Sequence, residues 1–144
     1  MDVIRFYRPT DPWGELSNFY PSPMTIDALT WATSEHYFQA AKFPGAPQAE
    51  RVRLAATPAE AKVLGSDRTA PLRRDWTAVR DAVMRTALTA KFTQHDDLRT
   101  LLLGTGDAVL VEHTERDSYW GDGGDGSGVN RLGLLLMEVR AELA

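Results

Sequence analysis

Residues 119–132 read YWGDGGDGSGVNRL, and this stretch decides between the fold classes open to the chain. Residues 121–126 match the G-x-G-x-x-G pattern of dinucleotide-binding folds. Such a fold also needs a second parallel strand after the glycine-led helix, with an acidic residue near its end. Only residues 127–144 follow, and a single helix uses them. The sequence therefore excludes a dinucleotide-binding fold.

The same stretch does not fit a calcium-binding loop. Counted from Asp122, the third and fifth positions are Gly124 and Gly126, and the twelfth is Gly133 instead of glutamate. A flexible linker is an open alternative, because glycine-rich segments are usually mobile. We favour a loop whose backbone approaches a ligand at the start of the last helix, where free N–H groups attract an anion.

Local patterns predict the other elements. Strands are expected at residues 3–7 and 108–113, and two short ones within 24–31 around an Asp-Ala turn. Helices are expected after a cap at Thr33 or Ser34, and at 57–65 with Thr57 as its cap and Gly65 as its stop, 75–92, 96–104 and 129–143. The last helix should turn its apolar residues inward: Leu132, Leu135, Leu136, Val139 and Leu143. The predicted class is α+β: a predominantly helical single domain over residues 1–144 with a small antiparallel sheet.

The composition of the chain argues against several classes of function. The net charge of −4 argues against a broad electrostatic grip on nucleic acid. The chain contains no cysteine, which excludes disulfides, thiolate nucleophiles and Cys-based zinc sites. No apolar run suits a membrane span and no signal peptide is recognisable, so we expect a cytoplasmic protein without a membrane partner. The three histidines lack metal-ligand spacing, and we predict neither a metal nor a cofactor.

Residues 31–43, WATSEHYFQAAKF, carry a second candidate site. Glu35 and Gln39 are four residues apart and share a helix face, which Lys42 continues. A solvated salt-bridge stripe is the simpler interpretation of this spacing. The surrounding aromatic residues favour a buried Glu35, and burial would suit this carboxyl group to acid–base work. His36 is its neighbour; like His113, it is a candidate for a supporting role.

Residues 67–76, DRTAPLRRDW, carry a third candidate site. Three arginines, Arg68, Arg73 and Arg74, precede Trp76 and the long helix. Arginines bind phosphate through paired hydrogen bonds, and a tryptophan can stack on a base. A charged surface turn is the alternative.

Together, GELSNFYPSP, WATSEHYFQAAKF and HTERDSYWGDGGDGSGVNRLGLLLMEVR are more specific than any one motif. With these, and with DRTAPLRRDW, the chain closely resembles the YbiA-like family of the NADAR (NAD- and ADP-ribose-associated) superfamily. The resemblance implies an N-glycosidase. Family members hydrolyse phosphorylated ribosylaminopyrimidine intermediates of riboflavin synthesis, and relatives remove ADP-ribose from guanine in nucleic acid. The expected partner is therefore a phosphorylated nucleoside or an ADP-ribosylated base, including one in modified nucleic acid.

The resemblance also implies site residues. The catalytic residues by motif match are Glu35, Lys42, Trp76, Trp120 and Asp122. The substrate-binding candidates are Asn18, Phe19, Gln39, Arg68, Arg73, Tyr119, Gly121, Gly123, Gly124 and Asn130.

Ribosyl C–N cleavage passes through an oxocarbenium-like state. We expect Glu35 to stabilise that charge and activate water, and Asp122 to hold ribose hydroxyls or the water. Two roles are open for Lys42: it binds phosphate, or it attacks C1 and forms a Schiff base. The rival interpretation is a non-catalytic module that only binds ADP-ribose or a nucleotide.

Overall fold

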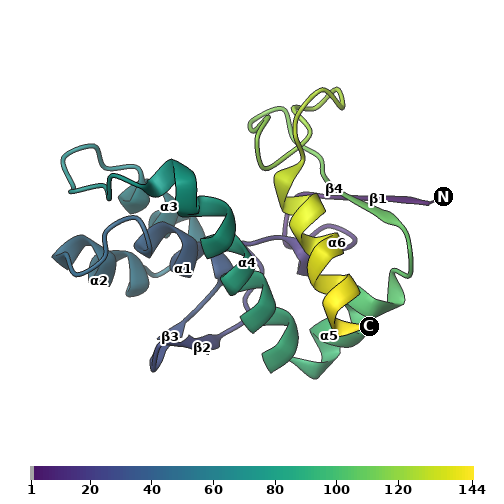
Figure 1. Cartoon of the computed structure of the whole chain (residues 1–144), viewed down its shortest axis with the longest axis horizontal. Helices are drawn as coiled ribbons and strands as arrows, with labels where there is room; N and C mark the ends of the chain where they lie inside the picture. The colour runs from purple at the N-terminus through teal and green to yellow at the C-terminus, as the bar shows by residue number, and fades with distance from the viewer. Residues whose placement is uncertain (1) are drawn as a thin grey trace. The chain divides into compact units, whose positions relative to one another are not determined.

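The structure, a computed structural model, describes residues 2–144 (Figure 1). Its helices are α1 (Ser34–Ala40), α2 (Pro47–Arg53), α3 (Pro58–Gly65), α4 (Trp76–Gln94), α5 (Asp96–Gly104) and α6 (Arg131–Leu143), with a short 3-10 helix at Gly14–Leu16. Its strands are β1 (Val3–Phe6), β2 (Met24–Ile26), β3 (Leu29–Trp31) and β4 (Val109–Glu112). The predicted α+β class with mostly helical content is confirmed. None of the helices described is long and apolar enough to cross a membrane.

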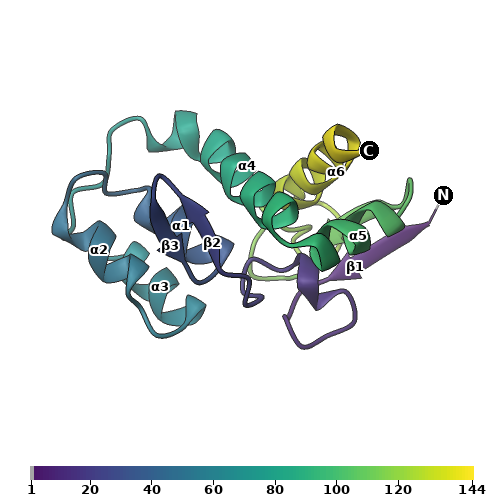
Figure 2. The ribbon, with the colours of Figure 1, turned by 90° about the horizontal axis from the view of Figure 1, so that it is seen from below.

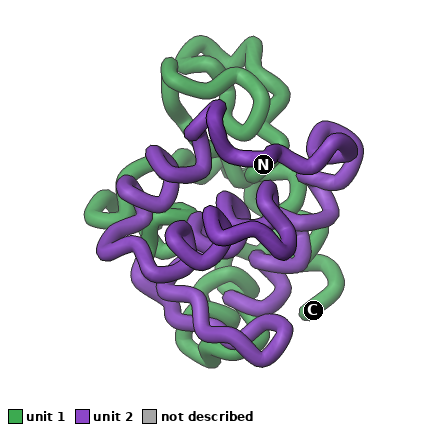
Figure 3. Tube along the Cα trace, turned by 90° about the vertical axis from the view of Figure 1, so that its left-hand side faces the viewer, with its two compact units in different colours: residues 1–20, 92–144 green, residues 21–91 purple. Residues whose placement is uncertain are grey.

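Contacts along the chain define two compact units, coloured separately in Figure 3. Unit 1 combines the N-terminal segment up to Tyr20 with residues 92–144, and unit 2 is residues 21–91. Helix α4 is divided between them at Phe92. The single domain over residues 1–144 stays a prediction.

In unit 2, a hairpin and three helices enclose an apolar core. Strands β2 and β3 form an antiparallel pair (Figure 2). The Asp27-Ala28 turn lies between them as predicted, and both of its residues have positive φ. Helices α1, α2 and α3 pack on one another, and α1 also contacts β3. The core residues are Met24, Trp31, Ala40, Phe43, Val52, Ala61 and Ala90.

Side-chain caps fix the starts of α1 and α3. Thr33 accepts a hydrogen bond from the backbone N–H of His36, so Thr33 is the cap of α1. Thr57 caps α3 through the N–H of Glu60, whose carboxylate accepts from the N–H of Ala56. Helix α2 was not predicted. Its seven residues bury only Gln48 and Val52, too few to reveal a helical period.

Unit 1 is built on a parallel strand pair. Strand β1 pairs with β4 in the register Val3↔Val109, so the predicted antiparallel sheet describes only β2 and β3. Helix α6 packs against β4 and α5. Its inner face buries Leu132, Leu135, Leu136 and Val139 as predicted. The expected inward residue Leu143 is only half-buried.

Candidate active site

Helix α1 buries a carboxylate and holds it with an amide. Glu35 is 7% exposed and Gln39 is 4% exposed. Gln39 Nε2 donates a hydrogen bond of 2.6 Å to Glu35 Oε2 across one helical turn. The predicted shared face is therefore confirmed. The alternative of a solvated stripe is wrong for these two residues, because both are buried.

The other end of the Gln39 amide faces the end of α3. Within residues 2–144, the buried oxygen Gln39 Oε1 has no hydrogen-bond partner. It lies against Gly65, where an added Cβ would come within 2.7 Å of Gln39 Cδ. A reversed amide would turn Oε1 toward the carboxylate, so the bond to Glu35 fixes the orientation observed.

The side chain of Lys42 also reaches the end of α3, at Gly65. Its Nζ donates a hydrogen bond of 3.1 Å to the Gly65 carbonyl and lies 5.8 Å from the centre of the Trp76 ring. Burial lowers the pKa of Lys42; the charge of Glu35 opposes this shift and that of Lys62 adds to it, so the pKa remains below its ordinary value. Among the described residues this ammonium has one hydrogen bond, which leaves two N–H groups for a ligand.

Trp76 begins α4 and reaches α1 through Phe38. The two ring centroids are 5.0 Å apart, and the backbone N–H of Arg73 donates to the Lys42 carbonyl at 2.9 Å. Unit 2 therefore brings together four of the predicted site residues, plus one that was predicted only as a helix stop. We call Glu35, Gln39, Lys42, Gly65 and Trp76 the α1 cluster.

The arginines before Trp76 lie in an exposed segment. Arg73 pairs with Asp75 at 2.7 Å, and the side chains of Arg68 and Arg74 are exposed. This arrangement fits the charged surface turn that the sequence allowed as an alternative. Phosphate binding by these arginines stays a prediction.

His36 has a structural role. It is fully buried, with Nδ1 2.8 Å from Thr33 Oγ1 and Nε2 3.0 Å from the Ala55 carbonyl. A carbonyl only accepts, so Nε2 carries the proton. The ring therefore joins the cap residue of α1, through Nδ1, to the segment after α2, through Nε2.

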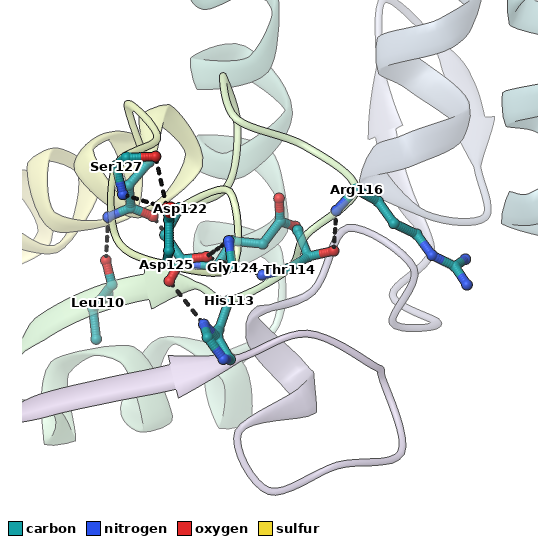
Figure 4. A network of polar contacts seen from close by, with 10 residues as sticks. Leu110, His113, Thr114, Arg116, Asp122, Gly124, Asp125 and Ser127 are labelled. Atoms are coloured by element: carbon teal, nitrogen blue, oxygen red, sulfur yellow. Dashed lines mark hydrogen bonds and ion pairs between the residues drawn. The ribbon is translucent and has the colours of Figure 1, made fainter.

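In unit 1, Asp122 anchors the glycine-rich loop (Figure 4). Its Oδ1 accepts from the N–H groups of Thr114 at 3.1 Å and Gly124 at 2.9 Å, and its Oδ2 lies 2.8 Å from His113 Nδ1. Burial raises the pKa of Asp122, but the hydrogen bonds from His113, Gly124 and Thr114 outweigh it and hold this pKa below its ordinary value. The histidine partner was missed, because sequence spacing does not reveal this contact.

The backbone N–H groups at the start of α6 donate hydrogen bonds to carbonyls of the glycine-rich loop. The N–H groups of residues 130, 131 and 132 donate to the carbonyls of residues 121, 119 and 120. The expectation that these donors bind an anion is therefore not met. The Asn130 side chain accepts from the Glu112 N–H and donates to the Leu110 carbonyl, which ties the loop to β4.

The glycines serve the folding of this loop. Gly123 and Gly124 have positive φ, and a Cβ on Gly121 would come within 2.9 Å of the Asp117 carbonyl. The linker alternative is wrong, because hydrogen bonds join this loop to β4 and α6. Ligand contact by these glycines stays a prediction.

The remaining candidates also belong to unit 1. Tyr119 and Trp120 are half-buried and meet edge to face, with ring centroids 5.0 Å apart. Asn18 is buried and Phe19 half-buried, just after the 3-10 helix. Substrate binding by these four residues stays a prediction.

Comparison with known proteins places the chain in a family. The NADAR domain model matches residues 5–144. The chain is 54% identical to N-glycosidase YbiA of Escherichia coli over 142 residues, covering 99% of this chain and 89% of that protein. An NMR structure of Escherichia coli YbiA matches with a TM-score of 0.91, covering 99% of this chain and 84% of that one. A riboflavin biosynthesis protein of Vibrio vulnificus is 45% identical over 140 residues, which are 97% of this chain and 38% of that protein.

The chain belongs to the NADAR domain family. The match covers both units, and the YbiA relative names the class of enzyme as N-glycosidase. The chain is accordingly an enzyme of the class that hydrolyses N-glycosyl compounds.

Proposed function

We propose that the chain hydrolyses the N-glycosidic bond of a phosphorylated ribosylaminopyrimidine, an intermediate of riboflavin synthesis. The observation that carries the proposal is the α1 cluster. In it, an amide holds a buried carboxylate, whose charge acts on the Lys42 amine, and this amine lies 5.8 Å from the centre of a tryptophan ring. The N-glycosidase and riboflavin biosynthesis names of the relatives support the bond and the substrate class.

Glu35 is the residue we assign to the reaction centre. Departure of the base leaves positive charge on the ribose ring, and a nearby carboxylate stabilises this charge. The Gln39 amide fixes the carboxylate by donating to Oε2 and stabilises its charged form. The attacking water then bonds to C1 and gives a proton to this carboxylate. The base, which leaves with the electron pair of the C–N bond, takes up a proton in turn.

Lys42 is the residue we assign to the phosphate. Its two unused N–H groups suit a phosphate oxygen, and the adjacent Trp76 ring offers a face to the ribose or the base. The lowered pKa of Lys42 also supports the alternative. In it, a neutral amine attacks C1, displaces the base with the C–N electron pair, and forms a Schiff base with the opened sugar.

Trp120 and Asp122 have separate proposed roles. The Trp120 ring is assigned to stacking on the base or ribose. The resemblance assigns Asp122 to ribose hydroxyls or to the water. Its hydrogen bonds to Thr114, Gly124 and His113 support a role in holding the loop that carries Trp120.

Two alternatives compete with this proposal: a different substrate, and a module that binds a nucleotide without cleaving it. ADP-ribosylated guanine in nucleic acid contains the same kind of C–N bond, and the resemblance favours it. A module that only binds ADP-ribose would use the same aromatic rings. The carboxylate distinguishes the two: a module that only binds should tolerate Glu35→Gln, whereas an enzyme should lose most of its rate and still bind.

The test is product release, measured by mass spectrometry for the wild type and Glu35→Gln. The substrates are a ribosylaminopyrimidine phosphate and a guanine-ADP-ribosylated oligonucleotide. We expect ribose phosphate from the first substrate and its loss in the variant. Free ADP-ribose from the second substrate alone would move the assignment to de-ADP-ribosylation. ADP-ribose binding without release from either substrate would establish the binding module.

A further inference from the structure

Gly65 contacts two members of the α1 cluster and ends α3. Its Cα lies against the Gln39 amide, so an added Cβ would overlap Oε1 and come within 2.7 Å of Cδ. Its carbonyl accepts the hydrogen bond from Lys42 Nζ at 3.1 Å. The side chain that Gly65 lacks would therefore occupy the space of the amide that holds Glu35.

The conformation of Gly65 does not explain the glycine. Its φ lies outside the positive range, and alanine is favoured over glycine within a helix. Gly104 ends α5 in the same way and also has no positive φ. Around a Cβ on Gly104, however, no atom of the described residues lies within 4 Å, apart from the chain neighbours and the backbone of the same helix. The two glycines therefore differ in their surroundings: only Gly65 has the Gln39 amide where a side chain would be.

We propose that Gly65 is a positioning residue of the active site, which sets the Glu35 carboxylate by leaving room for the Gln39 amide. This inference rests on the proposed function, because it assigns the Glu35 carboxylate to the reaction. The buried Gln39 Oε1, which has no hydrogen-bond partner among residues 2–144, supports it. The amide orientation in which Nε2 donates to the Glu35 carboxylate leaves Oε1 without a donor among these residues. A buried acceptor of this kind lowers the stability of the fold.

The test compares Gly65→Ala with Gly104→Ala and measures kcat and KM on the ribosylaminopyrimidine phosphate. We expect Gly65→Ala to lower kcat about tenfold to hundredfold, because a small displacement of a reacting group has effects of this size. KM should change much less. Gly104→Ala should keep the kcat and KM of the wild type. Equal kcat in Gly65→Ala and the wild type would overturn the proposal.

A double-mutant cycle separates positioning from a general loss of packing. Gln39→Ala alone should lower kcat, because Glu35 loses the hydrogen bond from Gln39 Nε2. If Gly65 acts through Gln39, adding Gly65→Ala to Gln39→Ala should not lower kcat further. The double variant should also recover part of the thermal midpoint lost in Gly65→Ala. The overlap with Oε1 and Cδ is then gone, while the Cβ of residue 39, 2.8 Å from the added Cβ, remains. A further fall of kcat in the double variant would contradict the proposal.

A structural readout keeps this test independent of the substrate. The side-chain amide signals of Gln39 are identified in a ¹⁵N NMR spectrum by their loss in Gln39→Ala. We expect them to shift in Gly65→Ala and to stay unchanged in Gly104→Ala. If the wild type cleaves neither substrate, the proposed function fails, while shifted Gln39 signals still support the contact. Unchanged signals in Gly65→Ala would overturn the inference whatever the activity.

Discussion

The α1 cluster and the glycine-rich loop contain similar residue types but use them differently. In the loop, Asp122 accepts three hydrogen bonds from its own surroundings, and the first N–H groups of α6 donate to carbonyls of the loop. In the α1 cluster, Lys42 retains two N–H groups and Gln39 Oε1 has no partner within the described chain.

We infer from this difference that the loop is a structural framework and that the α1 cluster is the reactive site. Polar groups that satisfy one another stabilise a structure but offer little to a ligand. Polar groups left with spare capacity in a buried setting reduce stability and are common where chemistry occurs. Substitutions in the α1 cluster should therefore act mainly on catalysis, and substitutions at Asp122 mainly on folding.

The largest effect is expected from Glu35→Gln. The side chain keeps its size and its contact with Gln39 but loses the charge that stabilises the oxocarbenium ion. We expect kcat to fall about 10²- to 10⁴-fold, the range for loss of a positioned acid–base group. The thermal midpoint should stay close to that of the wild type. A variant that keeps more than a tenth of the wild-type kcat would show that Glu35 is not at the reaction centre.

The second effect concerns stability in the loop. Asp122→Ala leaves the N–H groups of Thr114 and Gly124 and the ring of His113 without their acceptor. The free energy of unfolding should fall by roughly 2–4 kcal/mol in urea denaturation. Asp125→Ala is the matched control, because Asp125 is exposed and bonds only to Ser127 among the described residues. Equal stability of the two variants would contradict the framework role.

The stabilisation by Asp122 should also depend on pH. Its folded pKa is below the ordinary value of 3.8, so the ionised carboxylate favours the folded state. This contribution is complete above that value and is lost as pH falls through the folded pKa. We expect the stability difference between the wild type and Asp122→Asn to narrow below about pH 4, measured by urea denaturation at several pH values.

The third effect distinguishes the two roles of Lys42. Lys42→Met keeps the aliphatic packing and removes the ammonium. If Lys42 binds phosphate, KM should rise about tenfold to hundredfold, as for loss of a charge-assisted hydrogen bond. In the wild type, KM should rise as pH increases through the Lys42 pKa, which lies below 10.5 because of burial. A kcat that increases with pH instead, with an adduct trapped by borohydride, would establish the Schiff base.

The smallest effect is expected from Arg73→Ala. The Arg73–Asp75 pair is exposed, and exposed ion pairs contribute little to stability. We expect no measurable change in the thermal midpoint and less than about a threefold change in KM, because a single solvated cation is screened by salt. A KM increase as large as that of Lys42→Met would assign phosphate binding to the arginine segment.

Local signals predicted much of this fold. The cap at Thr57 with Pro58, and the apolar period of α6, are visible in sequence because they depend on neighbours within a few residues. The parallel pairing of β1 with β4 was not predicted, because it joins opposite ends of the chain. The missed helix α2 has Pro47 at its first position, a signal that the sequence did contain.

In the candidate site, too, only contacts between residues close in sequence were predictable. The Glu35–Gln39 contact was predictable, because residues four apart on a helix face one another. The contacts of Gly65 with Gln39 and Lys42 join different segments and have no sequence pattern. The partner of His113 was likewise hidden. The family resemblance named functional residues, but it did not reveal which of them are already satisfied by the loop.

The most direct test of the central claim is a ¹⁵N NMR titration of the protein with ribose 5-phosphate, the sugar product of the proposed reaction. We predict saturable shifts of the side-chain amide signals of Gln39 and of the indole N–H signal of Trp76. In Lys42→Met, these shifts should require higher concentrations of ribose 5-phosphate. Saturable binding that leaves both signals unchanged would place the sugar phosphate elsewhere and contradict the assignment of the α1 cluster as the reactive site.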